Sequence, residues 1–177
     1  MENLDLIPSN INLSGAEIEL IGVDDKEYIL KGITDKLRRK YDYIILDCPP
    51  SLNMLTINAL TAATSVLVPI QCEYYALEGL SQLIHTIDLV KDRLNKKLAM
   101  EGVVFTMYDA RTNLSLQVVE NVKDNLQQNI YKTIIPRNVR LAEAPSYGQP
   151  INIYDSRSAG AEAYRLLAEE VINREDK

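Results

Sequence analysis

The chain has 177 residues, of which 46% are hydrophobic and 25% charged, and it carries a formal net charge of −6. This size and balance are typical of one soluble globular domain, and the acidic charge argues against broad adhesion to nucleic acid or an anionic membrane. No apolar run reaches membrane-spanning length, and residues 1–3 do not begin a signal segment, so we expect a cytoplasmic protein without membrane contact. Cys48 and Cys72 suit neither a disulfide framework nor a zinc site, and we expect both to be buried near strand ends.

The first part of the chain predicts two strands and two helices. We expect a short strand at residues 4–8 and a helix that begins at the capping box Ser14-Gly15-Ala16-Glu17. Apolar residues spaced four apart predict a second helix over residues 29–37. Residues 43–46 are apolar without polar alternation, which is typical of a strand buried on both faces of a parallel sheet.

The rest of the chain alternates between helical and strand patterns. Helices are predicted at residues 52–62, 77–94, 118–126 and from about 158, strands at 65–70, 102–107 and 133–135, and a loop at 136–150. Strands separated by helices favour a mostly parallel sheet with right-handed crossovers. The predicted fold class is therefore α/β, in three layers.

One strand prediction ends at an acidic residue. Asp47 follows residues 43–46, and Pro49 and Pro50 then force the chain to turn. Ligands of open α/β sheets bind outside the carboxyl ends of the strands, and a carboxylate there suits a Mg²⁺-bound water, as in the Walker-B Asp of P-loop NTPases. The phosphate-binding motif G-x-x-x-x-G-K-[ST] does not occur, because none of the seven glycines precedes a lysine.

Four blocks of the sequence form a recognisable set: Asp47-Cys48-Pro49-Pro50-Ser51 with residues 56–60, and then residues 69–80, 106–112 and 135–150. Together they resemble the ParA/Soj family of chromosome- and plasmid-partitioning ATPases, its Soj-like subgroup above all. The resemblance covers nearly the whole chain and keeps the family's order. It implies a P-loop NTPase fold of the deviant Walker A class.

The resemblance also shows what is missing. Family members begin with a strand, a K-G-G-x-G-K-[ST] loop and a helix, followed by D-x-D-P-Q-G-N, and this sequence contains neither motif. We therefore expect residues 1–177 to form a single domain, the carboxyl-terminal two-thirds of a ParA/Soj-type ATPase domain without its first βα units. Truncation, a split or degenerate gene, or a natural fragment would each account for this.

The resemblance implies a function for the intact protein. It would dimerise with ATP and Mg²⁺, bind DNA non-specifically at the nucleoid, and respond to a ParB/Spo0J-type partner. Without the phosphate loop we expect no hydrolysis by this chain alone, and association as a homodimer or through an exposed sheet edge. The alternatives are a non-enzymatic remnant that modulates full-length relatives, a MinD-like ATPase, which the acidic residues 169–177 disfavour, and an iron-protein reductase, which lacks suitable cysteines.

The resemblance assigns roles to individual residues and names no catalytic residue in this chain. Asp47 would hold magnesium indirectly, and Arg111 and Arg140 would contact DNA phosphates. The residues implied at the adenine base are Thr106, Met107, Tyr108, Pro136, Arg137 and Asn138. Simpler readings stay open: a turn cap for Asp47, loop support for Asn138, core packing for Met107, and ordinary solvated surface positions for the two arginines.

Overall fold

The computed structural model describes residues 3–49, 51–125 and 129–175. It divides into two compact units, the first comprising Met1–Thr64 and His85–Leu98 and the second Ser65–Ile84 and Ala99–Lys177. The single domain expected over residues 1–177 stays a prediction.

The second unit is built on a parallel three-stranded sheet. Its strands, in spatial order, are β1 (Ser65–Gln71), β2 (Ala99–Tyr108) and β3 (Ile130–Pro136). Ile70 is paired with Phe105, and Phe105 is paired on its other side with Ile134. Val103, Val104 and Phe105 are at most 2% exposed, which explains the continuous apolar run of this central strand. The three strands predicted for this part of the chain are confirmed.

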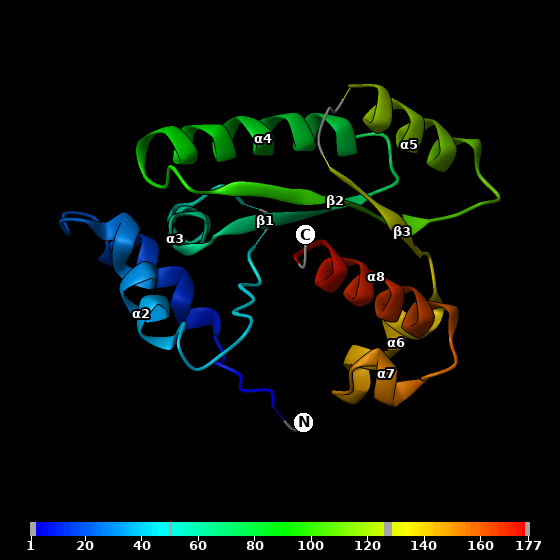
Figure 1. Ribbon diagram of the computed structural model, residues 1–177, viewed down its shortest axis with the longest axis horizontal. Helices are drawn as coiled ribbons and strands as arrows, with labels where there is room; N and C mark the ends of the chain where they lie inside the picture. The colour runs from blue at the N-terminus through cyan, green and yellow to red at the C-terminus, as the bar shows by residue number, and fades with distance from the viewer. Residues whose placement is uncertain (1–2, 50, 126–128, 176–177) are drawn as a thin grey trace. The chain divides into compact units, whose positions relative to one another are not determined.

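Helices cover both faces of this sheet (Figure 1). The helices are α4 (Ala76–Arg93), whose first part belongs to this unit, α5 (Asn113–Asn125), α6 (Val139–Glu143), α7 (Ile151–Tyr154) and α8 (Ala159–Glu175). The first part of α4 and α5 lie on one face, and α8 lies on the other. Val104 packs with Tyr131, Ile135 and Ala163 in the core on the α8 side. The three-layer α/β class with a parallel sheet is confirmed.

The first unit contains α1 (Ala16–Glu19), α2 (Ile29–Leu37), α3 (Met54–Ala62) and the second part of α4. The buried Asn58 accepts the Leu30 N–H at 3.1 Å and donates to the Lys26 carbonyl at 2.8 Å. Asn95 donates to the carbonyls of Leu60 and Ala63 at 3.0 and 2.8 Å. These two amides satisfy backbone groups at helix ends, which would otherwise lack partners.

Two strands predicted in the first unit are wrong. Neither residues 4–8 nor residues 43–46 form strand pairs within the described ranges. Ile45 is 88% exposed and Tyr43 is 46% exposed, so this segment is not the buried strand expected. An apolar run becomes a strand only where a neighbour supplies hydrogen bonds, and the local sequence cannot supply that neighbour.

Four local predictions also need correction or restriction. Ser14 does not cap a helix, because a 3₁₀ helix at Ile11–Gly15 precedes α1 and Asn10 caps it instead. Cys48 is exposed, not buried, whereas Cys72 is buried just beyond β1. The predicted loop at 136–150 contains α6 and a 3₁₀ helix at Ala144–Tyr147. Pro50 and Leu126 lie outside the described residues.

Candidate functional site

The structure brings the predicted base-binding segments together at the carboxyl ends of β2 and β3. Tyr108 is the register partner of Pro136, and the Arg137 N–H donates to the Tyr108 carbonyl at 2.9 Å. Thr106 and Met107 precede Tyr108, and Asn138 follows Arg137. Parallel neighbouring strands end at the same edge of a sheet, so these two short segments share one surface.

The side chains at this edge make different hydrogen bonds within the chain. The Thr106 hydroxyl donates to the Ile70 carbonyl at 3.2 Å and so helps join β2 to β1. The Asn138 side-chain oxygen accepts the Arg140 N–H at 2.9 Å and caps α6. Met107 is 38% exposed and has a φ of 54°, a left-handed backbone that is uncommon for a residue with a long side chain. Met107 is therefore an irregular position within β2, where the pairing with β3 also shifts register between Phe105 and Tyr108, and its partly exposed side chain is not plain core.

Arginine–carboxylate pairs surround the same edge. The Arg137 guanidinium lies 3.3 Å from a Glu73 carboxylate oxygen, just beyond the end of β1. Arg111 forms two bonds to Asp109, with Nε 2.9 Å from Oδ1 and Nη2 2.7 Å from Oδ2. These bonds, the Arg111 backbone N–H and the nearby Arg137 charge hold the pKa of Asp109 well below its ordinary value. Each strand end thus carries at least one charged group.

Arg140, the second predicted DNA contact, lies among acidic and phenolic groups. Its Nη1 donates to Glu143 at 2.8 Å, and its Nε lies 3.4 Å from an Asp155 oxygen. The Tyr154 hydroxyl donates to the same Glu143 oxygen at 3.0 Å. Hydrogen bonds from Arg140 and Tyr154 hold the pKa of Glu143 below its ordinary value, so this carboxylate stays ionised at neutral pH. Sequence reasoning missed Glu143, Asp155 and Tyr154.

Asp47 lies in the first unit, in an exposed stretch that pairs with no strand in the described ranges. Although Cys48 is exposed, partial desolvation by its surroundings and then the Asp47 charge raise the pKa of its thiol. No group of three or more His, Cys, Asp or Glu side chains in the described part of the chain is placed to hold a metal ion. The proposed magnesium role of Asp47 therefore rests on the sequence motif alone.

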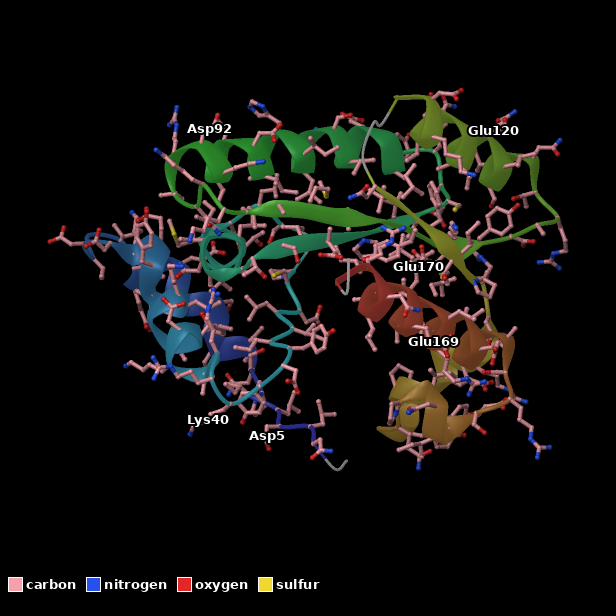
Figure 2. The ribbon with its side chains drawn as sticks, viewed as in Figure 1. Asp5, Lys40, Asp92, Glu120, Glu169 and Glu170 are labelled. Carbon is pink, nitrogen blue, oxygen red and sulfur yellow. The ribbon has the colours of Figure 1, made fainter. Side chains whose placement is uncertain are left out.

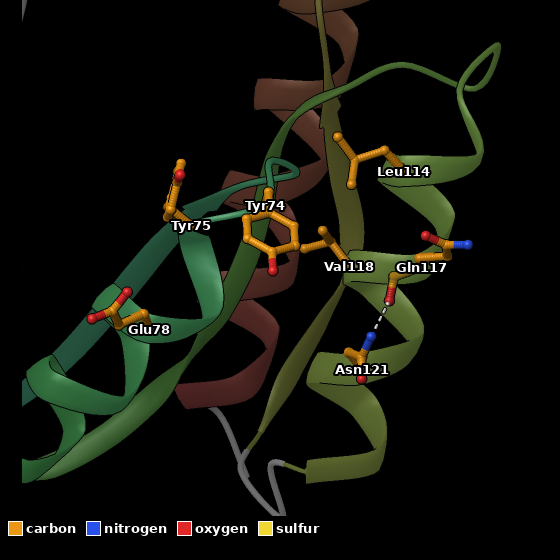
Figure 3. Close-up of a pocket in the computed structure, with 7 residues that line it drawn as sticks. All are labelled: Tyr74, Tyr75, Glu78, Leu114, Gln117, Val118 and Asn121. Carbon is orange, nitrogen blue, oxygen red and sulfur yellow. Dashed lines mark hydrogen bonds between the residues drawn. The ribbon is translucent and has the colours of Figure 1, made fainter.

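Figure 3 shows a surface hollow of about 360 Å³ that none of the predicted site residues lines. The hollow is lined by residues from the turn before α4, from the start of α4 and from α5: Tyr74, Tyr75, Glu78, Leu114, Gln117, Val118 and Asn121. The two tyrosine rings meet edge to face at 5.3 Å between centroids. The adjacent tyrosines in the sequence were the only local signal for it, and Glu78 is the single charged group among these seven residues.

Comparison with known proteins identifies the family. Residues 1–100 match the family described as AAA domain. The chain is 60% identical over 171 residues to the sporulation initiation inhibitor protein Soj of Bacillus subtilis, covering 97% of this chain and 68% of that protein. It is 54% identical over 172 residues to the chromosome partitioning protein ParA of Myxococcus xanthus, covering 97% of this chain and 61% of that protein.

A solved structure agrees with the sequence relatives. Cobyrinic acid a,c-diamide synthase of Mycobacterium smegmatis, with bound ADP and magnesium, superposes with a TM-score of 0.82 at 37% identity, over 97% of this chain and 63% of that one. The chain thus spans roughly two thirds of its relatives' length. No helix in the described part of the chain is long and apolar enough to cross a membrane. The sequence blocks, the parallel three-layer sheet and these similarities show that the chain belongs to the Soj/ParA family of chromosome-partitioning proteins.

Proposed function

We propose that this chain forms part of a ParA/Soj-type partitioning ATPase, in which it binds the adenine base and the phosphates of DNA. The observation that carries the proposal is the pairing of Tyr108 with Pro136, which puts the two base-binding segments side by side. Arg111 and Arg140 follow the same two strand ends. The protein would work in the cytoplasm at the nucleoid, dimerise with ATP, and respond to a ParB/Spo0J-type partner.

The residues present suit some parts of an ATP·Mg²⁺ complex better than others. Thr106, Tyr108 and Asn138 offer hydroxyl and amide groups that match the edge of a purine. Asp47 would hold magnesium through water, and the bound ion would neutralise phosphate charge. The sequence motif that supplies a cradle of backbone N–H groups and a lysine for the phosphates does not occur in residues 1–177. We therefore propose that hydrolysis needs groups that this chain does not supply.

Binding of duplex DNA by fluorescence anisotropy tests the proposal. We expect weak, sequence-independent binding that salt weakens steeply, because phosphate contacts release counterions. Arg111→Ala combined with Arg140→Ala should remove most of it. Arg165→Ala is the matched control, since Arg165 is an exposed arginine paired with Glu162 on α8. Identical curves for the double variant and the wild type, or tight binding to one sequence only, would contradict the proposal.

A second candidate function is a non-enzymatic subunit that modulates full-length relatives. The observation in its favour is that the motif G-x-x-x-x-G-K-[ST] does not occur in residues 1–177. The test is to add the chain to a full-length Soj relative and to measure ATP turnover with and without DNA. A change in the relative's turnover, with none from the chain alone, supports this function. Hydrolysis by the chain alone that disappears in Asp47→Ala would contradict it.

A further inference from the structure

The two arginines proposed to bind DNA have different local environments. Arg111 is held along one edge only, where Nε and Nη2 bind the two oxygens of Asp109. The Arg111 side chain is 85% exposed, and Asp109 is only 17% exposed and also accepts the Arg111 backbone N–H at 3.0 Å. Asp109 is thus a fixed support. In the described ranges no other residue binds this guanidinium, so its other edge is available.

Arg140 is held from more than one side. Glu143 binds Nη1, Asp155 approaches Nε, and the side chain is 49% exposed. Glu143 is itself fixed by the Tyr154 hydroxyl, and the Tyr154 ring stacks on Tyr147 at 5.1 Å between centroids. A phosphate contact through two N–H groups needs a free edge of the guanidinium. Each edge of the Arg140 guanidinium includes a nitrogen that already faces a carboxylate, Nη1 on one edge and Nε on the other.

We propose that Glu143, with Asp155, competes with DNA phosphate for Arg140, whereas Asp109 positions Arg111 for phosphate. The inference rests on the proposed DNA-binding function and adds that the two arginines contribute unequally to phosphate binding. Arg111 is the ready contact and Arg140 is a masked one. The carboxylate–arginine pair limits the number of phosphate contacts per chain, and so it limits both affinity and salt dependence.

The test is a salt series of DNA anisotropy titrations with Glu143→Gln and a matched control. Glu162→Gln changes the net charge equally and breaks the same kind of pair, three residues apart, between exposed side chains of α8. Glu143→Gln should bind about twofold to fivefold tighter, the range of a surface ion pair. Its plot of log K against log salt should steepen by about 0.9, the value of one added phosphate contact. Glu162→Gln should bind within about 1.5-fold of the wild type, because salt screens distant charges.

A double-mutant cycle distinguishes the release of Arg140 from Glu143 from the general effect of removing one negative charge. Arg140→Ala should change wild-type affinity less than about twofold, because the masked arginine contributes little. In the Glu143→Gln background it should abolish the whole gain. Asp155→Asn is the second variant, should Glu143→Gln disturb α6, and it should act in the same direction. Circular dichroism checks that each variant is folded.

The outcomes test the competition for Arg140 separately from the proposed DNA binding on which it rests. Equal gains for Glu143→Gln and Glu162→Gln, or a gain that survives Arg140→Ala, would overturn the competition. So would an Arg140→Ala loss as large as that of Arg111→Ala in the otherwise wild-type chain. If replacing both arginines changes nothing, DNA binding itself is overturned. A gain that depends on Arg140, with the steeper salt dependence, supports the inference.

Discussion

Glu170 shows how one side chain completes the outer strand of the sheet (Figure 2). From α8 its carboxylate accepts the backbone N–H groups of Lys132 and Thr133, both at 2.9 Å, and the Thr133 hydroxyl at 2.8 Å. Arg174 adds an ion pair at 2.8 Å, four residues along the helix. Strand edges expose unpaired donors, and here a helix carboxylate binds two of them. The interaction therefore joins α8 to β3 in both packing and polar contacts.

We predict that Glu170→Gln destabilises the chain, because an amide cannot accept all of these bonds. The loss should be about 1 to 3 kcal/mol, the cost of weakening a charged hydrogen-bond network. Urea unfolding followed by circular dichroism measures it. Glu169→Gln, at the exposed neighbouring position on the same helix, is the control and should stay within about 0.5 kcal/mol. Equal stability of the two variants would contradict the prediction.

The same carboxylate predicts a pH dependence. Burial raises the pKa of Glu170, but the hydrogen bonds from Lys132, Thr133 and Arg174 outweigh it and lower the pKa below the ordinary 4.5. A carboxyl group whose pKa is lower in the folded state than in the unfolded state stabilises the fold at pH values above its unfolded-state pKa. This stabilisation is lost as the pH falls through the folded-state pKa. Below about pH 4.5 the stability difference between wild type and Glu170→Gln should therefore shrink. A difference that stays constant down to acid unfolding would show that the charge is not involved.

At the residue scale the family resemblance implied that residues 106–108 and 136–138 meet, but it did not indicate the partners of the arginines. The apolar runs alone predicted the two strands, not that Tyr108 pairs with Pro136. Glu143, Tyr154 and Asp155 were missed, since they lie in or after a segment predicted as loop. The signal that was available is Asn138, whose side chain caps α6. The sequence predicted a loop there instead of α6, because Pro136, Pro145 and Gly148 are typical of irregular backbone.

Among the elements, β2 and β3 approach each other closely at Gly102. A methyl group there would lie 2.8 Å from the Asn129 carbonyl oxygen and 2.8 Å from the Tyr131 ring. The Asn129 carbonyl is fixed, because it accepts the Val103 N–H at 2.8 Å. The strands therefore need a residue without a side chain at this position.

We predict that Gly102→Ala destabilises the chain by about 1 to 3 kcal/mol, the usual cost of overpacking. Gly79→Ala is the matched control, since Gly79 lies within α4 and nothing lies within 4 Å of the added carbon. That substitution should stabilise by about 0.5 to 1 kcal/mol, because glycine is costly within a helix. Thermal unfolding of both variants beside the wild type measures the two effects. A stable Gly102→Ala protein would mean that Tyr131 and β3 shift without cost.

The position of its pairing partners decides whether an element could be predicted from the sequence. Strands β1, β2 and β3 find one another within the chain, so their apolar runs became a sheet. Residues 43–46 have the same pattern but no pairing neighbour in the described ranges, and the pattern alone could not reveal this. Helices α2, α3 and α8 begin close to their predicted starts, because helix hydrogen bonds join residues four apart and need no distant partner.

For the whole molecule, exposed apolar side chains are the feature with the largest consequence. Leu6, Ile7, Ile11 and Ile45 are each 79% or more exposed. Single exposed apolar residues are ordinary, but several in one compact unit favour association. In the other unit β1 is an outer strand, where Pro69 lacks an N–H and a register shift occurs between Val66 and Leu67. Both features weaken strand addition, so we propose that side chains drive association more than this edge does.

We predict that the chain self-associates, and that Ile11→Lys with Ile45→Lys reduces the association. Charges at two highly exposed apolar positions oppose contact between copies, and their cost to folding should be within about 0.5 kcal/mol. Light scattering across a concentration series measures the mass of the particles. Leu116→Lys, at a 49% exposed position on α5, is the control and should associate like the wild type. A wild-type chain that stays a monodisperse monomer at high concentration would contradict the prediction. Association that persists unchanged in the double variant would show that the Ile11 and Ile45 side chains do not drive it.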